Sequence, residues 1–337
     1  MICPHCTANL KRKDRPGQRC GTCKKPFVFE PKANPFALHD VKVRRLAAKL
    51  GEDNNWYTTT QLWYAAARKS NKASNDGTAG CGIVVPIIGG VVLLGIGIGG
   101  DTPALTVVGA VLLVISATII ALRMAGVMKR AVVVKMPLDQ FRKEILGGWS
   151  RVYGNPPGGI VDEPKLRPGP PPPQPAFAIL SPDRAVLACL QANDVGRWFK
   201  AALAARVADL PPAVPVAVLH DASLDGEVFL ATARHELRGR RVVDLGLRPR
   251  AVLAAKDPFK LRTKDRQPER IAWLKANTDL TPKELEWLGD GWSSPIAALR
   301  PAQLLARVKK VATHFSGAND PAQRAAAAVG FMTWPAA

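Results

Sequence analysis

The chain has 337 residues, of which 47 are Lys or Arg and 27 are Asp or Glu, so its formal net charge at pH 7 is +20. Hydrophobic residues make up 47% of the sequence, which is enough to build packed cores and excludes a fully disordered chain. The positive charge favours an anionic partner, nucleic acid or acidic lipid, without choosing between them.

Four cysteines near the N-terminus form two C-x2-C pairs. Cys3 and Cys6 make the first pair, Cys20 and Cys23 make the second, and 13 residues separate the pairs. Four thiolates at this spacing can surround one Zn²⁺ as a closed tetrahedron, which leaves no coordination position for a substrate. We therefore expect a zinc ribbon over residues 1–30 in which the metal is structural.

Basic side chains crowd the sequence of this ribbon. One interpretation is contact with the phosphates of nucleic acid, and the other is contact with anionic lipid next to a membrane. Charge alone leaves both interpretations open. The residues expected to make these contacts are Lys11, Arg12, Lys13, Arg15, Arg19, Lys24 and Lys25.

Residues 38–75 are expected to form a small winged-helix-like unit. Apolar residues recur at helical spacing up to Gly51, and residues 58–61 (TTTQ) have the pattern of a capping box that begins a second helix. Tyrosine and tryptophan residues surround that second helix. The alternative is an amphipathic helix whose aromatic side chains lie at the lipid interface.

Residues 79–126 contain two long apolar runs that indicate a transmembrane hairpin. The runs cover about 80–100 and 103–123, and Asp101 is the one charged residue between them. At about 1.5 Å of rise per residue, each run can cross a hydrocarbon core of roughly 30 Å. A buried helical hairpin in a soluble core is the alternative.

Basic residues flank both runs and set the expected orientation. Because Lys and Arg favour the cytoplasmic side, we expect an integral membrane protein with both termini in the cytoplasm. Gly95 and Gly99 form a small-xxx-small pair, which makes self-association through the glycine-rich run a candidate interaction. The flanking basic residues are Arg68, Lys69, Lys72, Arg123, Lys129, Arg130 and Lys135.

The rest of the chain divides by composition. We expect a juxtamembrane helical region at 127–155, a proline-rich linker with polyproline character at 156–175, and a C-terminal tail at 317–337. Between linker and tail, residues 176–316 alternate short apolar runs with helical patterns. This alternation predicts an α/β domain with a small parallel sheet.

Polar residues follow the predicted strands, at the sheet edge where α/β proteins place their sites. They include Ser181, Asp183, His220, Asp221 and Asp225. Carboxylate oxygens can hold Mg²⁺. Asp is also common as a helix cap and in turns, and a structural role is the simpler interpretation of His220.

Four segments in this order resemble one known family. Residues 57–64 (YTTTQLWY) resemble a tyrosine-bearing winged-helix segment, and residues 221–226 (DASLDG) look like the acidic turn of a Toprim domain. Residues 244–249 and 280–288 are similar to later parts of the same family. The family is that of the topoisomerase VI A subunit and its meiotic-recombination relatives, and the resemblance covers about half of the chain.

The resemblance implies a Toprim-like domain joined to a winged helix. It places Tyr64 at the position of the nucleophile that cleaves DNA, and it assigns Mg²⁺ to Asp221 and Asp225. Mg²⁺ would be a cofactor only if the chain is such a transesterase.

Three departures from the family pattern bear on catalysis. Ser181 stands where the family has a Glu, Ser223 replaces the second Asp of the acidic pair, and Thr60 replaces an Arg in the tyrosine segment. Loss of two carboxylates weakens the hold on a divalent metal. These departures indicate a degenerate relative that binds rather than cuts.

The leading hypothesis is therefore a multidomain, membrane-anchored, cytoplasm-facing protein. Its zinc ribbon and basic domains would bind nucleic acid or a protein partner without catalysis. The first alternative is a membrane-tethered, DNA-cleaving transesterase that uses Tyr64 and Mg²⁺. The second is a structural membrane adaptor whose basic surfaces hold anionic lipid.

Overall fold

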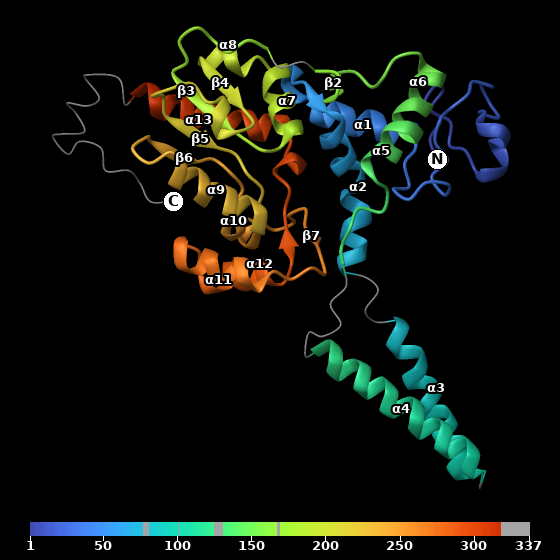
Figure 1. Ribbon diagram of the computed structural model, residues 1–337. Helices are drawn as coiled ribbons and strands as arrows, with labels where there is room; N and C mark the ends of the chain where they lie inside the picture. Colours follow the sequence, from blue (N-terminus) through green and yellow to red (C-terminus); the bar gives the residue numbers. More distant parts are fainter. Residues whose placement is uncertain (77–80, 101, 125–130, 167–168, 318–337) are drawn as a thin grey trace.

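The computed structural model describes residues 1–76, 81–100, 102–124, 131–166 and 169–317 (Figure 1). Within these residues the chain is a mixed α/β protein with small parallel sheets, as the sequence predicts. The predicted tail at 317–337 lies outside the described residues except for Gly317. The basic residues Lys129 and Arg130 and the predicted turn at Asp101 also lie outside them.

The N-terminal part consists of the cysteine-rich segment, two helices and one short strand. His39 caps the first helix by accepting a hydrogen bond from the Lys42 amide. The side chain of Asp40 accepts bonds from the Val28 and Phe29 amides, which holds the cysteine-rich segment against this helix. The elements are η1 (Arg12–Asp14), η2 (Pro16–Gln18), α1 (Asp40–Leu50), η3 (Glu52–Asn54), β1 (Tyr57–Thr58) and α2 (Thr59–Asp76).

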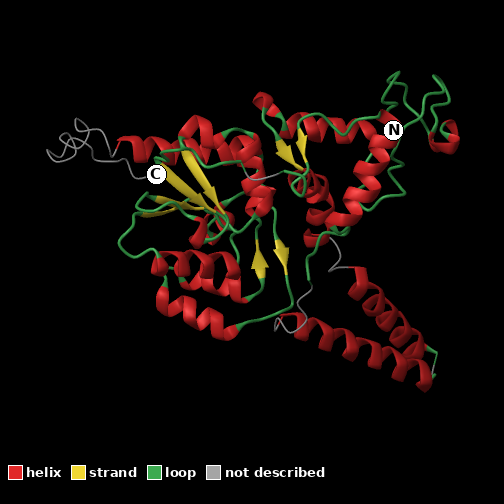
Figure 2. Cartoon of the chain, turned by 45° about the horizontal axis from the view of Figure 1, so that its top comes forward, coloured by secondary structure: helices red, strands yellow, loops and turns green. Residues whose placement is uncertain are grey.

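Two apolar helices follow, α3 (Cys81–Gly99) and α4 (Pro103–Met124), and they lie side by side (Figures 1 and 2). Gly97 lies against Thr106 and Gly109 against Leu94, so the two helices run antiparallel. Pro103–Ala121 of α4 is long and apolar enough to cross a membrane. Among the described residues, no other helix meets both conditions. Ile87–Gly99 of α3 is apolar but shorter.

The chain then returns to the core that it left at the end of α2. Met136, Phe141 and Trp149 are buried together with Tyr57 and Leu62, so the segments before and after the apolar pair share one hydrophobic core. The returning elements are α5 (Leu138–Gln140), the π-helical η4 (Phe141–Leu146), α6 (Gly147–Tyr153) and β2 (Ile160–Val161). β2 lies in the proline-rich segment and pairs in parallel with β1.

The C-terminal part is built on a four-stranded parallel sheet in the order β4-β3-β5-β6. The chain runs from β3 outward to β4 and then crosses to β5 on the other side of β3. This change of direction lies between β3 and β5, which is where such sheets bind ligands at their carboxyl edge. The strands are β3 (Phe177–Leu180), β4 (Ala201–Ala204), β5 (Val216–Val218) and β6 (Val242–Asp244).

Helices, short turns and one small hairpin complete this part. Strands β7 and β8 pair antiparallel, Leu261 opposite Ser293. In chain order the elements are α7 (Arg184–Ala192), α8 (Val195–Phe199), η5 (Val207–Asp209), α9 (Leu224–Glu236), α10 (Pro249–Ala254), β7 (Leu261–Arg262), α11 (Pro268–Asn277), α12 (Pro282–Gly289), β8 (Trp292–Ser293), η6 (Ile296–Ala298) and α13 (Pro301–Gly317).

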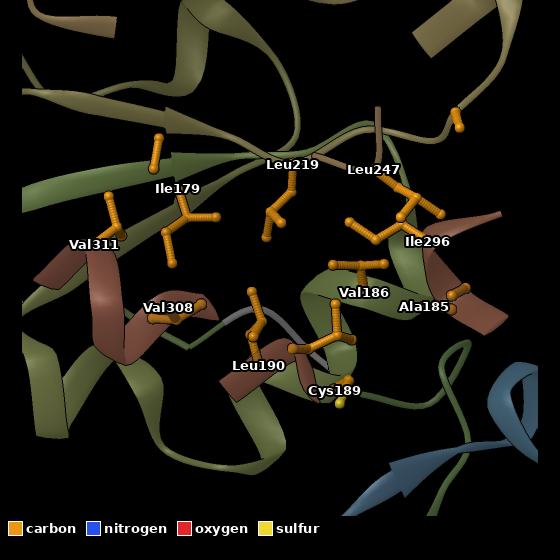
Figure 3. Close-up of a cluster of buried hydrophobic side chains, with 14 of the residues drawn as sticks. Ile179, Ala185, Val186, Cys189, Leu190, Leu219, Leu247, Ile296, Val308 and Val311 are labelled. Atoms are coloured by element: carbon orange, nitrogen blue, oxygen red, sulfur yellow. The ribbon is translucent and has the colours of Figure 1, made fainter. Parts of the chain in front are cut away.

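Both faces of the sheet are covered, because successive side chains of a strand point to opposite sides. Ala178 and Leu180 of β3 join the core under α9. Phe177 and Ile179 join the larger core on the other face, between the sheet and α7 and α13. Figure 3 shows part of that core: Ile179 and Leu219 from the sheet, Val186 and Leu190 from α7, and Val308 and Val311 from α13.

Candidate metal centre and sheet-edge site

The four predicted zinc ligands come together. The sulfur atoms of Cys3, Cys6, Cys20 and Cys23 all lie within 4.8 Å of one another. The Cys3 and Cys23 sulfurs are 3.8 Å apart, and those of Cys6 and Cys20 are 3.7 Å apart. A tetrahedral zinc with bonds of about 2.3 Å separates its sulfurs by about 3.8 Å. The cluster therefore fits one metal ion such as Zn²⁺.

The two cysteine pairs have the same backbone conformation. Thr7 and Lys24 each follow the first cysteine of their pair by four residues, and both have left-handed φ angles, 60° and 58°. Their amides bond to the carbonyl oxygens of Cys3 and Cys20, at 3.2 and 2.9 Å. Each turn thus directs both of its sulfur atoms toward the centre of the four-cysteine cluster.

Backbone amides also point at the sulfurs. The His5 amide lies 3.4 Å from the Cys3 sulfur, and the Cys23 amide lies 3.4 Å from the Cys20 sulfur. The Cys23 amide lowers the pKa of Cys20 to about 6, because it stabilises the thiolate. The pKa of Cys6 is instead raised: its hydrogen bond to Ala8 opposes the shift, but desolvation and the neighbouring sulfurs outweigh it. The thiolate is the form that binds a metal.

The ribbon presents most of its cations to solvent. Six of the seven predicted contact residues are exposed, and none of these six has an ion-pair partner within the described ranges: Lys11, Arg12, Lys13, Arg19, Lys24 and Lys25. Arg15 differs from them. Its guanidinium pairs with Glu30 at 2.9 Å, and its side chain is only 8% exposed. Arg15 therefore helps to hold the ribbon together and offers little to a partner.

Asp183, at the carboxyl edge of the sheet, is a helix cap. Its Oδ1 atom accepts bonds from the amides of Ala185 and Val186, at 2.7 and 3.2 Å, where α7 begins. Burial raises the pKa of Asp183, although the two amides oppose the shift. One oxygen of this carboxylate is therefore engaged in structure.

Asp221 and Asp225 have different environments. Asp221 follows β5, and its Oδ1 accepts a bond of 2.7 Å from the Ile296 amide. Burial, with the charge of Asp183 as a smaller contribution, raises its pKa to about 6. Asp225 is exposed and pairs with Arg270 at 2.6 Å. The structure does not bring Asp225 into a shared set of metal ligands with Asp221.

Tyr64 of α2 lies near the same edge. Its ring packs edge-on against Phe259, with 5.2 Å between centroids. Burial raises the pKa of its hydroxyl, and the charges of Asp221 and Asp183 raise it further. The tyrosine from residue 64 and the two carboxylates from beyond residue 180 are thus neighbours. Without a cation between them, this environment opposes a phenolate.

Glu163 is a buried carboxylate at this site that sequence reasoning missed. It accepts bonds from the Thr60 amide at 2.7 Å and from Arg142 Nη2 at 3.0 Å, and it contributes to the raised pKa of Asp183. Its position in the proline-rich segment gave no periodic pattern that could have identified it. It anchors that segment to the start of α2.

A buried charge network lies behind β5 and β6. His220 Nε2 is 3.0 Å from Asp244 Oδ1, and its Nδ1 is 2.9 Å from the Asp221 carbonyl oxygen. Burial opposes protonation of His220, but the hydrogen bond and charge of Asp244 outweigh it and raise the pKa. His220 is therefore held in place as a structural residue, as the sequence suggests.

Glu227 of α9 completes the network. The sequence did not predict its role, because a Glu within a helix is usually exposed to solvent. Its side chain is fully buried, and burial raises its pKa to about 7. Arg248 Nη1 lies 3.4 Å from Glu227 and 3.2 Å from Asp244. Arg248 also pairs with Asp279, at 2.8 Å.

The sheet edge does not offer a ready-made Mg²⁺ site. Across the part of the chain that the structure describes, the four cysteines are the one group of three or more metal-ligating side chains close enough to share an ion. Asp183 and Asp221 each use one oxygen in a structural hydrogen bond, and Asp225 is paired with Arg270. The residues therefore do not fit the metal that cleavage would require.

No protein-family model, curated protein or solved structure gives a significant match to this chain.

Proposed function

We propose that this protein is a membrane-anchored, cytoplasm-facing binding protein whose zinc ribbon presents a basic surface to nucleic acid. The α/β domain serves as a scaffold in this proposal, and no catalytic step is assigned to it. A protein partner is a further candidate for the same domains.

The observation that carries the proposal is the pairing of a closed metal centre with unpaired cations. Four thiolates leave the metal no open position, so the ribbon shapes a surface rather than catalysing a reaction. Six exposed Lys and Arg side chains surround it without ion-pair partners among the described residues. Free cations on a rigid module are what phosphate contact needs.

The anchor in this proposal is the pair of α3 and α4. Large apolar side chains on both helices are exposed, among them Ile96 and Ile98 of α3 and Val107, Val111 and Val114 of α4. Such side chains are stable in lipid and costly in water. We assign α4 as one span and α3 as the second, with the flanking basic residues on the cytoplasmic side.

The test measures nucleic-acid binding by the full-length protein in lipid nanodiscs with bound zinc. Fluorescence anisotropy of a labelled oligonucleotide should give a binding constant whose logarithm falls linearly with the logarithm of salt concentration. Triple charge reversal at Lys11, Arg12 and Lys13 should lower the affinity by at least about tenfold and flatten the salt dependence.

A matched control reverses three exposed lysines of the α/β domain, Lys275, Lys283 and Lys309. The net charge then changes equally in both variants. An equal loss of binding in both would show that the ribbon is not the specific site of nucleic-acid contact. Anionic vesicles form the second arm of the test. Binding of vesicles without binding of the oligonucleotide would support the adaptor and contradict the nucleic-acid proposal.

One observation favours the transesterase as the second candidate: Tyr64 lies close enough to Asp221 and Asp183 for their charges to raise its pKa. The occupied carboxylates and the buried phenol argue against it. The assay incubates the full-length protein with DNA and Mg²⁺ and denatures the mixture. A covalent DNA adduct that is absent in Tyr64→Phe would contradict the non-catalytic proposal.

A further inference from the structure

A cleft of about 850 Å³ lies between α1 and the loop at residues 154–159. Its lining combines aromatic rings with amide side chains and one cation. The polar and aromatic lining residues include Arg44, Asn54, Asn55, Trp56, Tyr153 and Asn155. A volume of this size is typical of ligand sites and accommodates a planar heterocycle.

Trp56 is held rigidly at this cleft. Its amide donates to Asn193 Oδ1 at 2.9 Å, and its carbonyl oxygen accepts from Asn193 Nδ2 at 2.8 Å. The next residue, Tyr57, donates from its amide to Gly159 and from its hydroxyl to Gly158. The Trp56 side chain is nevertheless 48% exposed. A large ring on a fixed backbone loses little conformational entropy when it binds a ligand.

Arg44 links the cleft to the cysteine-rich segment. Arg44 Nη1 donates to the Pro4 carbonyl oxygen at 3.0 Å, inside the first cysteine turn. The same guanidinium lies over the Tyr153 ring, 5.2 Å from its centroid, and the His5 ring is 6.0 Å from that of Tyr153. One wall of the cleft is therefore attached to the first cysteine turn of the segment that carries the exposed cations.

We propose that this cleft binds single-stranded nucleic acid by stacking a base on Trp56. Arg44 and the ribbon's exposed Lys and Arg residues contact the phosphates beside it. The side-chain amides of Asn54 and Asn155 offer hydrogen bonds to the edge of the base, whereas that of Asn55 donates to the Glu52 carbonyl oxygen at 2.6 Å. An aromatic platform beside a basic surface is the arrangement used by proteins that bind single strands.

The charge of the surrounding segment favours an anionic occupant. Residues 1–80 contain 15 Lys or Arg against 6 Asp or Glu, so the segment that supplies half of the cleft lining attracts a polyanion. Stacking on an aromatic ring needs an unpaired base, which selects a single strand over a duplex. This inference rests on the proposed function, because it names the class of nucleic acid.

The experiment compares two oligonucleotides of equal length and charge, one of thymidines and one abasic throughout. Full-length protein in nanodiscs should bind the thymidine strand about 5- to 100-fold more tightly, because only that strand can stack. Trp56→Ala should remove this difference and leave binding of the abasic strand unchanged. Trp198→Ala is the matched control, since Trp198 is 72% exposed and lies on α8, outside the cleft lining.

The outcomes distinguish base stacking on Trp56 from nucleic-acid binding by the basic surface. If wild-type protein binds both strands equally, the stacking cleft is wrong while phosphate contact stands. If it binds neither strand, the proposed function fails and the inference fails with it.

A peptide of residues 169–175 (GPPPPQP) tests whether the cleft is instead an aromatic groove that binds proline-rich segments. Trp56-dependent binding of this peptide, without base-dependent binding of DNA, would also overturn the inference.

Discussion

Arg44 donates a hydrogen bond from Nη1 to the backbone carbonyl oxygen of Pro4 at 3.0 Å. Because Pro4 lies between Cys3 and Cys6, this bond attaches the first cysteine turn to α1. Asp40 makes a second attachment through the amides of Val28 and Phe29. The two cysteine turns are therefore fixed to the helical core.

Replacing one ligand should release the metal and loosen this attachment. Cys20→Ser leaves three thiolates, so zinc content measured by mass spectrometry should fall from one ion per chain to much less than one. The ribbon should then become sensitive to protease, because its small core consists mainly of the cysteines themselves. The control is Cys189→Ala, since Cys189 is a buried residue of α7 and lies outside the cysteine cluster. Full zinc occupancy in Cys20→Ser would contradict four-cysteine coordination.

The contact between α3 and α4 should depend on particular glycines. A Cβ atom at Gly109 would lie 2.6 Å from the Leu94 backbone nitrogen, whereas one at Gly95 would meet nothing within 4 Å. Gly109→Val should therefore separate the helices, and Gly95→Val should leave them packed. Gly95 and Gly99 remain free for contact between copies.

A cross-link can report on this contact. A Cβ atom at Gly90 would lie 3.0 Å from Leu113 Cγ, so cysteines at these two positions are close enough for a disulfide. With Cys81→Ser in the background, the oxidised yield measured by mass spectrometry should fall in Gly109→Val and persist in Gly95→Val. Equal yields in the two variants would contradict the observed packing.

Glu227→Gln should change how stability depends on pH. The pKa of Glu227 rises from 4.5 to about 7 on folding, so between these values the folded state binds more protons than the unfolded state. Stability of the wild type therefore falls as pH rises through this window. The glutamine variant lacks this loss and should gain stability relative to the wild type between pH 4.5 and 7, by on the order of 1 to 3 kcal/mol.

The measurement is the denaturation midpoint of both proteins at several pH values. His220 also has a raised pKa, to which the charge of Glu227 contributes, so Glu227→Gln should lower the pKa of His220 as well. A constant difference between wild type and variant across pH 4.5 to 7 would show that Glu227 ionises normally.

The two roles considered for Asp183 predict different mutational effects. As a helix cap, Asp183→Ala should cost about 1 kcal/mol, while Asp183→Asn, which keeps an accepting oxygen, should be nearly neutral. As a metal ligand, both variants would lose function equally. Chemical denaturation followed by tryptophan fluorescence checks the first expectation. A cost for Asp183→Asn as large as that for Asp183→Ala would show that the charge itself matters.

Much of the architecture follows from short-range patterns. The spacing of Cys3, Cys6, Cys20 and Cys23 predicts the metal site, because ligands in two tight turns need only local geometry. An uninterrupted apolar run predicts α4, and alternating strands and helices predict a parallel sheet. The winged-helix and Toprim assignments stay predictions.

The positions of the site residues could not be derived in that way. Tyr64 and Asp221 are separated by more than 150 residues and by the apolar pair of helices, and only the packing of α2 beside the sheet edge makes them neighbours. The burial of Arg15 depends on Glu30, and the buried role of Glu163 depends on Thr60 and Arg142.

The sequence by itself thus determined the cysteine cluster, the apolar helix and the alternation of the α/β domain, because these depend on the spacing of nearby residues. The tertiary structure alone decided which carboxylates are free, which cations are exposed, and that Trp56 faces a cleft beside the ribbon. Those properties depend on burial and on hydrogen bonds between segments distant in the chain, such as that from the Trp56 amide to Asn193.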